Sequence, residues 1–175
     1  MRPSTWRGGR SLERELTRVE SIELKNVSYG TILKNVNLKI SRGGESVGIV
    51  GGESGSGKTT LANVIACHYR PEEGEVLVND IPAKEFGNLR RKIILVETNE
   101  FIFPGTVREN VTLWEEFDEE ELREAVSIAK VNLPLDEKIG PSYREVSLGE
   151  RQRIALARAL IRKPEVLILD EAFGS

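Results

Sequence analysis

One stretch of this sequence combines glycines, a lysine and a threonine at a spacing suited to holding phosphate. Residues 52–59 read Gly-Glu-Ser-Gly-Ser-Gly-Lys-Thr and fit the pattern GxxxxGK[S/T] in full. Glycines let successive backbone N–H groups turn inward around a β-phosphate, while Lys58 would neutralise phosphate charge and the Thr59 hydroxyl would bind Mg²⁺. The stretch therefore predicts a nucleotide site, and the neighbours that would share the phosphate contacts are Gly52, Glu53, Ser54, Gly55, Ser56, Gly57 and Thr60.

A second candidate group is a pair of carboxylates, Asp170 and Glu171, that follows an apolar run at residues 166–169. Such a run is typical of a strand buried on both faces of a parallel sheet, and ligands gather at the carboxyl ends of such strands. Asp170 would hold Mg²⁺ through water, and Glu171 would orient and deprotonate an attacking water. Without a phosphate loop in the same chain, an acidic pair of this kind would be a solvated turn.

The segments around these residues supply the order strand, loop, helix that a phosphate loop needs. Residues 46–50 form a compact apolar run that predicts a strand, and residues 59–66 have helical character. Because strands alternate with helices along the chain, we predict an α/β fold. Antiparallel strands are expected within residues 22–40, further strands at 75–78, 93–96 and 166–169, and helices at 119–130 and 147–162.

Composition limits the class of protein. The chain has 175 residues, enough for one domain, and its 39% hydrophobic and 30% charged residues exclude collagen-like and wholly disordered proteins. A net charge of −3 gives no reason to expect nucleic acid as a partner. Cys67 is the single cysteine, which excludes an internal disulfide and a cysteine metal cluster.

The beginning of the chain differs from the rest. Residues 1–19 carry five arginines and lack the apolar stretch of a signal peptide. We expect residues 1–20 to form a linker or tail, solvated rather than bound to an anionic membrane surface, and residues 21–175 to form one folded domain. No apolar run approaches the ~18 residues of a membrane span, so we expect the chain on the cytosolic side.

A third segment carries a family resemblance. Residues 146–160 read Val-Ser-Leu-Gly-Glu-Arg-Gln-Arg-Ile-Ala-Leu-Ala-Arg-Ala-Leu, between the phosphate loop and the acidic strand. The segment resembles the signature helix of ATP-binding cassette (ABC) proteins, and residues 69–78 and 105–110 are similar to ABC exporters. The resemblance covers residues 22–175. It implies a P-loop NTPase with a mixed or parallel sheet core, an N-terminal antiparallel β subdomain, and a small helical subdomain that carries the signature helix.

The resemblance also implies ligands and partners. ATP and Mg²⁺ would be bound, with Tyr29 stacking on adenine, although Tyr29 could instead be an ordinary turn residue. Two ABC domains, identical or different, would close head to tail on two ATP, so that Ser147 and Gly149 of each signature cap the γ-phosphate held by the other. Transmembrane subunits would convert closure into transport, which would place this chain peripherally on the cytosolic face of the membrane.

Several positions depart from the family pattern. Leu148 and Glu150 stand where the family usually has glycine and glutamine, and Thr98 stands where it has a glutamine that contacts Mg²⁺. Ser147 and Glu150 are also at capping-box spacing, so the serine hydroxyl would serve its own helix. We therefore hypothesise that this signature caps a partner's ATP poorly. His68 lies too early in the chain to be the family's switch histidine.

These departures separate binding from hydrolysis. Phosphate binding rests on backbone amides and Lys58, whereas each missing charge-positioning side chain costs roughly 10²–10⁴ in rate. Three interpretations remain open: an exporter ATPase, a hydrolytically degenerate subunit paired with an active cassette, and a cassette of DNA repair or translation. The family's strand leading to the switch histidine would follow Ser175, so we expect a truncated frame, a fragment, or a chain completed by a partner.

Overall fold

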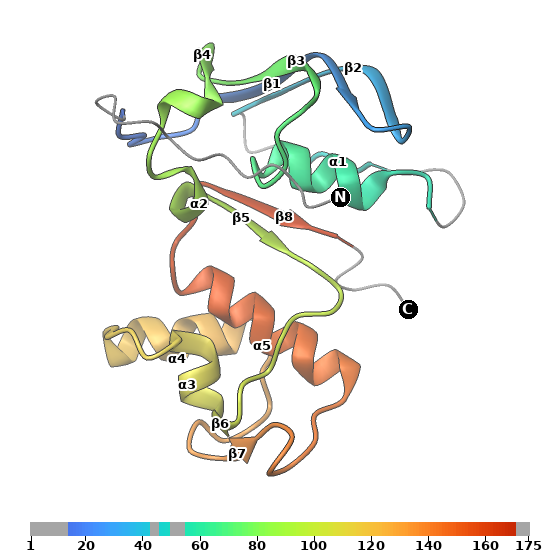
Figure 1. The fold of residues 1–175 in the computed structure, drawn as a ribbon. Coiled ribbons are helices and arrows are strands. Elements are labelled where there is room, and N and C mark those ends of the chain that lie inside the picture. Colours follow the sequence, from blue (N-terminus) through green and yellow to red (C-terminus); the bar gives the residue numbers. More distant parts are fainter. Residues whose placement is uncertain (1–13, 43–45, 50–54, 171–175) are drawn as a thin grey trace. The chain divides into compact units, whose positions relative to one another are not determined.

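The computed structural model describes residues 14–42, 46–49 and 55–170. They belong to two compact units, Met1–Leu95 and Val96–Ser175. Figure 1 shows the helices and strands of each unit. Of the helices in the described ranges, none combines the length and apolarity needed to cross a bilayer.

The first unit contains an antiparallel sheet of β1 (Ser21–Tyr29), β2 (Leu33–Ser41), β3 (Glu73–Val78) and β4 (Ile81–Pro82), in the order β2-β1-β3-β4 (Figure 1). In the central strand, Ile22 pairs with Ile40 on one side and with Val78 on the other. Ile22, Leu24 and Val27 are buried, and a register shift between Leu24 and Val27 keeps all three in the core despite their uneven spacing. The antiparallel strands expected within residues 22–40 are thereby confirmed as β1 and β2, and the strand expected at 75–78 is confirmed as β3, whereas β4 was not predicted.

The residues just before β1, part of the expected leader, pack against the first unit. Leu16 and Val19 are buried. The side-chain amide of Asn88 donates to the Leu16 carbonyl and accepts from the Leu16 N–H, both at 2.9 Å. Asn79 accepts in the same way from the backbone at the start of β1, at 3.1 Å from the Ser21 nitrogen. Two isolated apolar side chains give no periodicity, so local patterning does not reveal this packing.

The predicted strand at residues 46–50 is wrong for the part that the structure describes. Residues 46–49 have no strand assignment, and Val47 and Ile49 are exposed. An apolar strand is stable only when neighbouring strands pair its backbone groups, and within the described ranges no strand does so here. The apolar pattern of the run does not indicate whether a neighbouring strand pairs with it.

The rest of the first unit is mainly helical. Its phosphate-loop helix buries Ala62, Asn63, Val64 and Ile65, and Cys67, just beyond it, is buried as well. Burial raises the pKa of the Cys67 thiol to about 12. The elements are α1 (Lys58–Ile65), the 3₁₀ helix η1 (Ala83–Glu85), α2 (Leu89–Lys92) and β5 (Ile93–Val96), whose last residue, Val96, is the first residue of the second unit.

The described part of the second unit contains the helices α3 (Val107–Thr112), α4 (Glu119–Ile128) and α5 (Leu148–Leu160) (Figure 1). Ser147 and Asp118 cap two of them as their sequences predict. Ile154, Ala157 and Ile161 face a shared core with the other two helices, which confirms the apolar stripe expected for residues 147–162. Its elements are β6 (Gly105–Thr106), α3 (Val107–Thr112), α4 (Glu119–Ile128), β7 (Lys138–Ile139), α5 (Leu148–Leu160) and β8 (Val166–Leu169).

The strand β8 is present where it was predicted, but its predicted burial on both faces is wrong. Val166, Leu167 and Ile168 are only half-buried, and Leu169 is 45% exposed. A uniformly apolar run favours burial, but the burial that a strand reaches depends on which elements cover it. The described part of the chain covers it incompletely.

Candidate nucleotide-binding site

The phosphate loop enters α1 through a glycine that no other residue could replace without strain. Gly57 is the N-cap, with φ 91° and ψ 6°, in the left-handed region. A Cβ built there would lie 2.7 Å from Ile32 Cγ2, closer than real contacts allow. The first backbone N–H groups of a helix have no partner within the helix, and they favour an anion. Gly57 therefore gives this end of α1 no side-chain cap, as the predicted phosphate contact requires.

The side chains predicted to bind phosphate and metal lie in or beside the first turn of α1. Lys58 Nζ donates to Ser56 Oγ at 3.1 Å, so the ammonium group turns back toward the loop. The Thr59 carbonyl accepts from Asn63 Nδ2 at 3.0 Å, and Asn63 is itself buried. Thr60 completes the turn, and Gly55 precedes it with φ 90°. The other predicted contacts, Gly52, Glu53 and Ser54, lie outside the described residues.

Tyr29, the predicted adenine contact, lies at the end of β1. Its ring stacks on that of Tyr69, with centroids 5.4 Å apart and planes inclined by 15°. Both rings are half-buried. An aromatic face at a strand end suits a purine, and the role of Tyr29 stays a prediction.

The second unit holds the signature segment, and its serine is engaged by its own helix. Ser147 Oγ accepts from the Glu150 N–H at 3.2 Å, and Glu150 Oε2 accepts from the Ser147 N–H at 2.8 Å. The capping box expected from the spacing is thus confirmed. Arg144 Nη2 lies 2.9 Å from Glu150 Oε1. Hydrogen bonds from Arg144 and Ser147 lower the pKa of Glu150 to about 2, so the carboxylate is ionised at neutral pH.

The two residues between Ser147 and Glu150 differ in surroundings. Leu148 is 54% exposed, so an apolar side chain projects where the family usually has glycine. Gly149 lies beneath a guanidinium group, because a Cβ built on it would meet Arg153 Nη1 at 3.2 Å. Arg153 Nε is buried and, among the described residues, has no hydrogen-bond partner. The start of α5 therefore combines a bulky apolar group with charges of both signs.

Asp170, at the end of β8, lies beside Thr98, the residue at the position where the family has a glutamine. Asp170 is buried, its N–H donates to the Val96 carbonyl at 3.0 Å, and its carbonyl accepts from Thr98 Oγ1 at 3.1 Å. The side chain of Thr98 is shorter than the glutamine that the family has at this position. Glu171 lies outside the described residues. The structure thus places Thr98 beside Asp170, as the family alignment implies.

The donors available for Mg²⁺ fit a site completed by phosphate. Within the described ranges, no group of three or more His, Cys, Asp or Glu side chains could hold a metal ion. Mg²⁺ is commonly held by one or two protein oxygens together with water and substrate phosphates. Thr59, in the first unit, and Asp170, in the second, each carry a side-chain oxygen of that kind, and their role as Mg²⁺ ligands stays a prediction.

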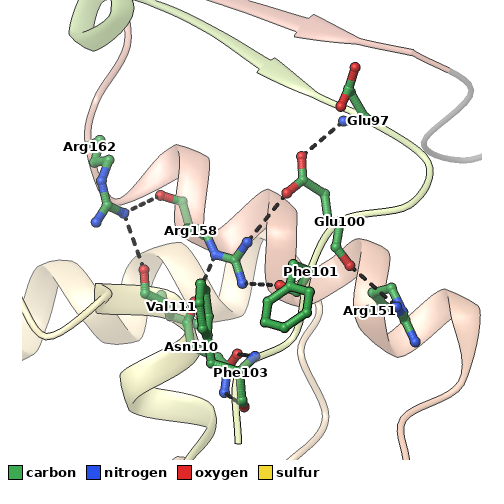
Figure 2. A network of polar contacts seen from close by, with 9 residues as sticks. All are labelled: Glu97, Glu100, Phe101, Phe103, Asn110, Val111, Arg151, Arg158 and Arg162. Carbon is green, nitrogen blue, oxygen red and sulfur yellow. Dashed lines mark hydrogen bonds and ion pairs between the residues drawn. The ribbon is translucent and has the colours of Figure 1, made fainter. Parts of the chain in front are cut away.

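An arginine of the signature helix fixes the segment that carries Thr98 (Figure 2). Arg158 donates from Nε to the Asn110 carbonyl at 2.8 Å and from Nη2 to the Phe101 carbonyl at 2.9 Å. Its Nη1 lies 3.3 Å from Glu100 Oε2, and Glu100 also accepts from the Glu97 N–H. Burial lowers the pKa of Arg158, and the nearby Glu100 opposes that shift. The chain after β5 is thereby tied to α5.

Several positioning residues were not recognised in the sequence. Arg158 acts on residues far from it along the chain, and no spacing signals such contacts. Asn63 is different, because a single amide within the apolar helix run is a visible signal for an internal hydrogen bond. Asn110 is a further positioning residue that was not recognised. It is fully buried, and its side-chain amide bonds both the N–H and the carbonyl of Phe103.

Comparison with known proteins gives consistent results. The sequence pattern described as "ABC transporter" matches residues 33–174. The heterocyst differentiation ATP-binding protein HepA of a Nostoc species is 41% identical over 167 residues, covering 87% of this chain and 27% of that protein. The ATP-dependent lipid A-core flippase of Syntrophus aciditrophicus is 42% identical over 176 residues, covering 92% of this chain and 29% of that protein. The chain therefore spans less than a third of these relatives.

Comparison of structures agrees with the sequence matches. A bacterial Atm1-family ABC exporter with ATP bound superposes with a TM-score of 0.83 at 28% identity, covering 94% of this chain and 31% of that one. The P-loop NTPase fold predicted from the sequence, with its antiparallel N-terminal sheet and its helices, is confirmed. The chain belongs to the ABC transporter family and is an ATP-binding domain homologous to those of exporters.

Proposed function

We propose that this chain binds ATP with Mg²⁺ as the nucleotide-binding cassette of an exporter. The observation that carries the proposal is the start of α1, where left-handed Gly57 exposes the helix N-terminus with Lys58 in its first turn. Backbone N–H groups and one ammonium group are what a polyphosphate requires. Because these contacts come mainly from the backbone, the departures elsewhere in the chain leave them intact.

Each remaining site residue has a defined part in the proposal. Lys58 neutralises phosphate charge, and the Thr59 hydroxyl and the Asp170 carboxylate supply oxygens for Mg²⁺, which draws electron density from the terminal phosphate. Glu171 orients and deprotonates water, and Tyr29 supplies the face for adenine. Gly52, Glu53, Ser54, Gly55, Ser56, Gly57 and Thr60 complete the phosphate loop.

The proposed partners are a second cassette and a membrane subunit. A homologue from Rickettsia bellii, 38% identical over 171 residues, is named a putative export ATP-binding/permease protein, and this chain covers 29% of it. In our chain, Phe101, Phe103 and Trp114 form an aromatic edge of edge-to-face ring pairs, with Phe101 60% and Trp114 58% exposed. Exposed apolar clusters mark interaction surfaces, so we assign this edge to the membrane subunit at the cytosolic face.

One set of observations favours the alternative, a hydrolytically degenerate cassette paired with an active one. The Ser147 N–H and Oγ are both bound to Glu150, which is an anion at neutral pH. Such an anion would repel a partner's γ-phosphate. Thr98, beside Asp170, also lacks the reach of the family's glutamine. In this case ATP binding persists while turnover is slow.

Phosphate release from Mg-ATP distinguishes the two forms of the proposal. An active cassette gives steady turnover that Glu171→Gln abolishes. A degenerate cassette binds ATP in calorimetry but releases no more phosphate than the Glu171→Gln variant does. If neither heat of binding nor phosphate release is detected, and Lys58→Ala changes nothing, the proposed function is wrong.

A photo-crosslinker tests the membrane partner. Placed at Phe101 in cells, it should yield a product that stays with the membrane after alkaline extraction. The matched control is the exposed Ile128 of α4, which lies outside the aromatic edge. Equal yields at both positions would contradict the assigned surface.

A further inference from the structure

Two tyrosines from separate parts of the first unit form a stacked pair. Tyr29 ends β1, and Tyr69 follows α1. Their ring centroids are 5.4 Å apart and their planes are inclined by 15°. An aromatic ring has two faces, and Tyr69 covers one face of Tyr29.

The segment after Tyr69 holds the end of β1 in place. The Glu72 N–H donates to the Ser28 carbonyl at 3.0 Å, and Glu72 Oε2 accepts from the Gly30 N–H at 3.2 Å. Gly74 approaches the same strand so closely that a Cβ would lie 2.4 Å from the Asn26 carbonyl oxygen. Tyr29 therefore sits between two anchored neighbours, Ser28 and Gly30.

Tyr69 is in turn connected to the phosphate-loop helix. Its N–H and that of His68 both donate to the Asn63 carbonyl, at 3.2 and 2.8 Å. Asn63 is buried, and its Nδ2 donates to the Thr59 carbonyl in the first turn of α1. A continuous set of hydrogen bonds thus leads from Thr59 to the backbone of Tyr69.

A second connection joins Tyr29 to the same loop from the opposite direction. The Ile32 N–H donates to the Tyr29 carbonyl at 3.2 Å. The Ile32 side chain then packs against Gly57, where it leaves no room for a Cβ. The tyrosine pair is consequently located relative to the phosphate loop at two points, through Asn63 and through Ile32.

From this geometry we infer that Tyr69 is a positioning residue for the purine. The inference rests on the proposed function, because it assigns the other face of Tyr29 to the base of ATP. Tyr69 supports the covered face, so that the base binds to a ring already fixed at the right place relative to Lys58 and Thr59. Preorganisation of this kind improves affinity by removing the ordering cost from the binding step. The contribution lies in the ring and does not require the Tyr69 hydroxyl.

Calorimetry with two ligands tests this role on the full chain. Mg-ATP carries both the base and the phosphates, whereas magnesium tripolyphosphate carries the phosphates alone. Tyr69→Ala should weaken Mg-ATP binding about 3- to 10-fold, the size of an aromatic pair contribution, and leave tripolyphosphate affinity unchanged. Tyr69→Phe should restore the affinity for Mg-ATP. In a Tyr29→Ala background, Tyr69→Ala should have no further effect.

Other outcomes overturn the inference. If Tyr69→Ala weakens both ligands equally, Tyr69 only maintains the local fold. If it strengthens Mg-ATP binding, Tyr69 occupies the place of the base. If the alanine variant fails to fold, Tyr69→Leu replaces it, because leucine keeps a large apolar side chain but has no aromatic ring. The affinity of Tyr69→Leu for Mg-ATP is then compared with that of Tyr69→Phe. Failure of the proposed function looks different, because the unmodified chain would then bind neither ligand.

Discussion

The phosphate-loop region of the first unit and the signature region of the second use their polar groups in opposite ways. At the start of α1, Gly57 has no side chain, so the first turn of the helix is not capped from within. At the start of α5, Ser147 and Glu150 satisfy each other, and Arg144 adds an ion pair. The N-terminus of α1 has no side-chain cap, and we propose that it binds phosphate, while the N-terminus of α5 is stabilised by its own residues.

In the signature segment, Ser147 and Glu150 are engaged within the second unit by the capping box and by the ion pair with Arg144. A capping box and its ion pair add stability to α5, and they engage groups that the family uses across the dimer. Binding in the first unit and stability in the second should therefore respond to different substitutions.

The largest effect is expected at the ligand-directed end. Lys58→Ala should weaken Mg-ATP binding about 100-fold in calorimetry, because a charge-assisted contact to phosphate is lost. Lys84→Ala, in η1, removes an exposed lysine and should leave the affinity unchanged. If Lys58→Ala changed the affinity for Mg-ATP by less than about 3-fold, the proposal that the start of α1 binds the ligand would be contradicted.

The next effect concerns the stability of the second unit. Arg158→Ala should lower the free energy of unfolding by about 2 kcal/mol, since it removes the ion pair with Glu100 and the donor to the Asn110 and Phe101 carbonyls. The Arg158 side chain is only 13% exposed. The control Arg123→Ala removes a 73% exposed arginine in an i,i+4 pair and should cost under about 0.5 kcal/mol. Urea denaturation followed by circular dichroism measures both, and equal costs would contradict the network in Figure 2.

Acid should selectively remove the contribution of the capping box. Glu150→Ala should cost about 1 kcal/mol at pH 7. The pKa of Glu150 in the folded chain, about 2, is below its ordinary value of 4.5. The contribution is therefore complete above about pH 4.5 and declines as the pH falls toward 2. Denaturation should show a smaller difference in stability between the two proteins at pH 3 than at pH 7, and an equal difference at both pH values would show that the carboxylate is not involved.

The smallest effect tests whether the signature is weakened by its charge. Glu150→Gln keeps the capping-box spacing but removes the anion, so ATP-dependent dimerisation should tighten about 3- to 5-fold. Sedimentation with Mg-ATP in a Glu171→Gln background measures the dimer without turnover. An unchanged dimer affinity would show that Glu150 does not hinder capping.

Local patterns in the sequence predicted much of this molecule. Glycine spacing located the phosphate loop, and the serine-to-glutamate spacing located the capping box at Ser147. Both features depend on residues within one or two helical turns, which a sequence displays directly.

Features that depend on distant neighbours could not be predicted in this way. The apolar run at 46–49 predicted a strand. Whether it forms one depends on backbone hydrogen bonds to neighbouring strands, which the sequence of the run does not specify. Arg158 contacts Phe101 and Asn110 through the fold, and only the folded chain brings them together. Tyr69 belonged to a segment noted for its resemblance to exporters, but its stacking on Tyr29 required both β1 and α1 to be in place.

The burial of Cys67 has a practical consequence for such experiments. With the pKa of its thiol at about 12, almost no thiolate exists at neutral pH, so the native cysteine should resist maleimide reagents in the folded chain. A cysteine introduced at an exposed position would then be the reactive one without any prior substitution. Spin or fluorescent labels attached there could report how two copies approach each other when nucleotide is added.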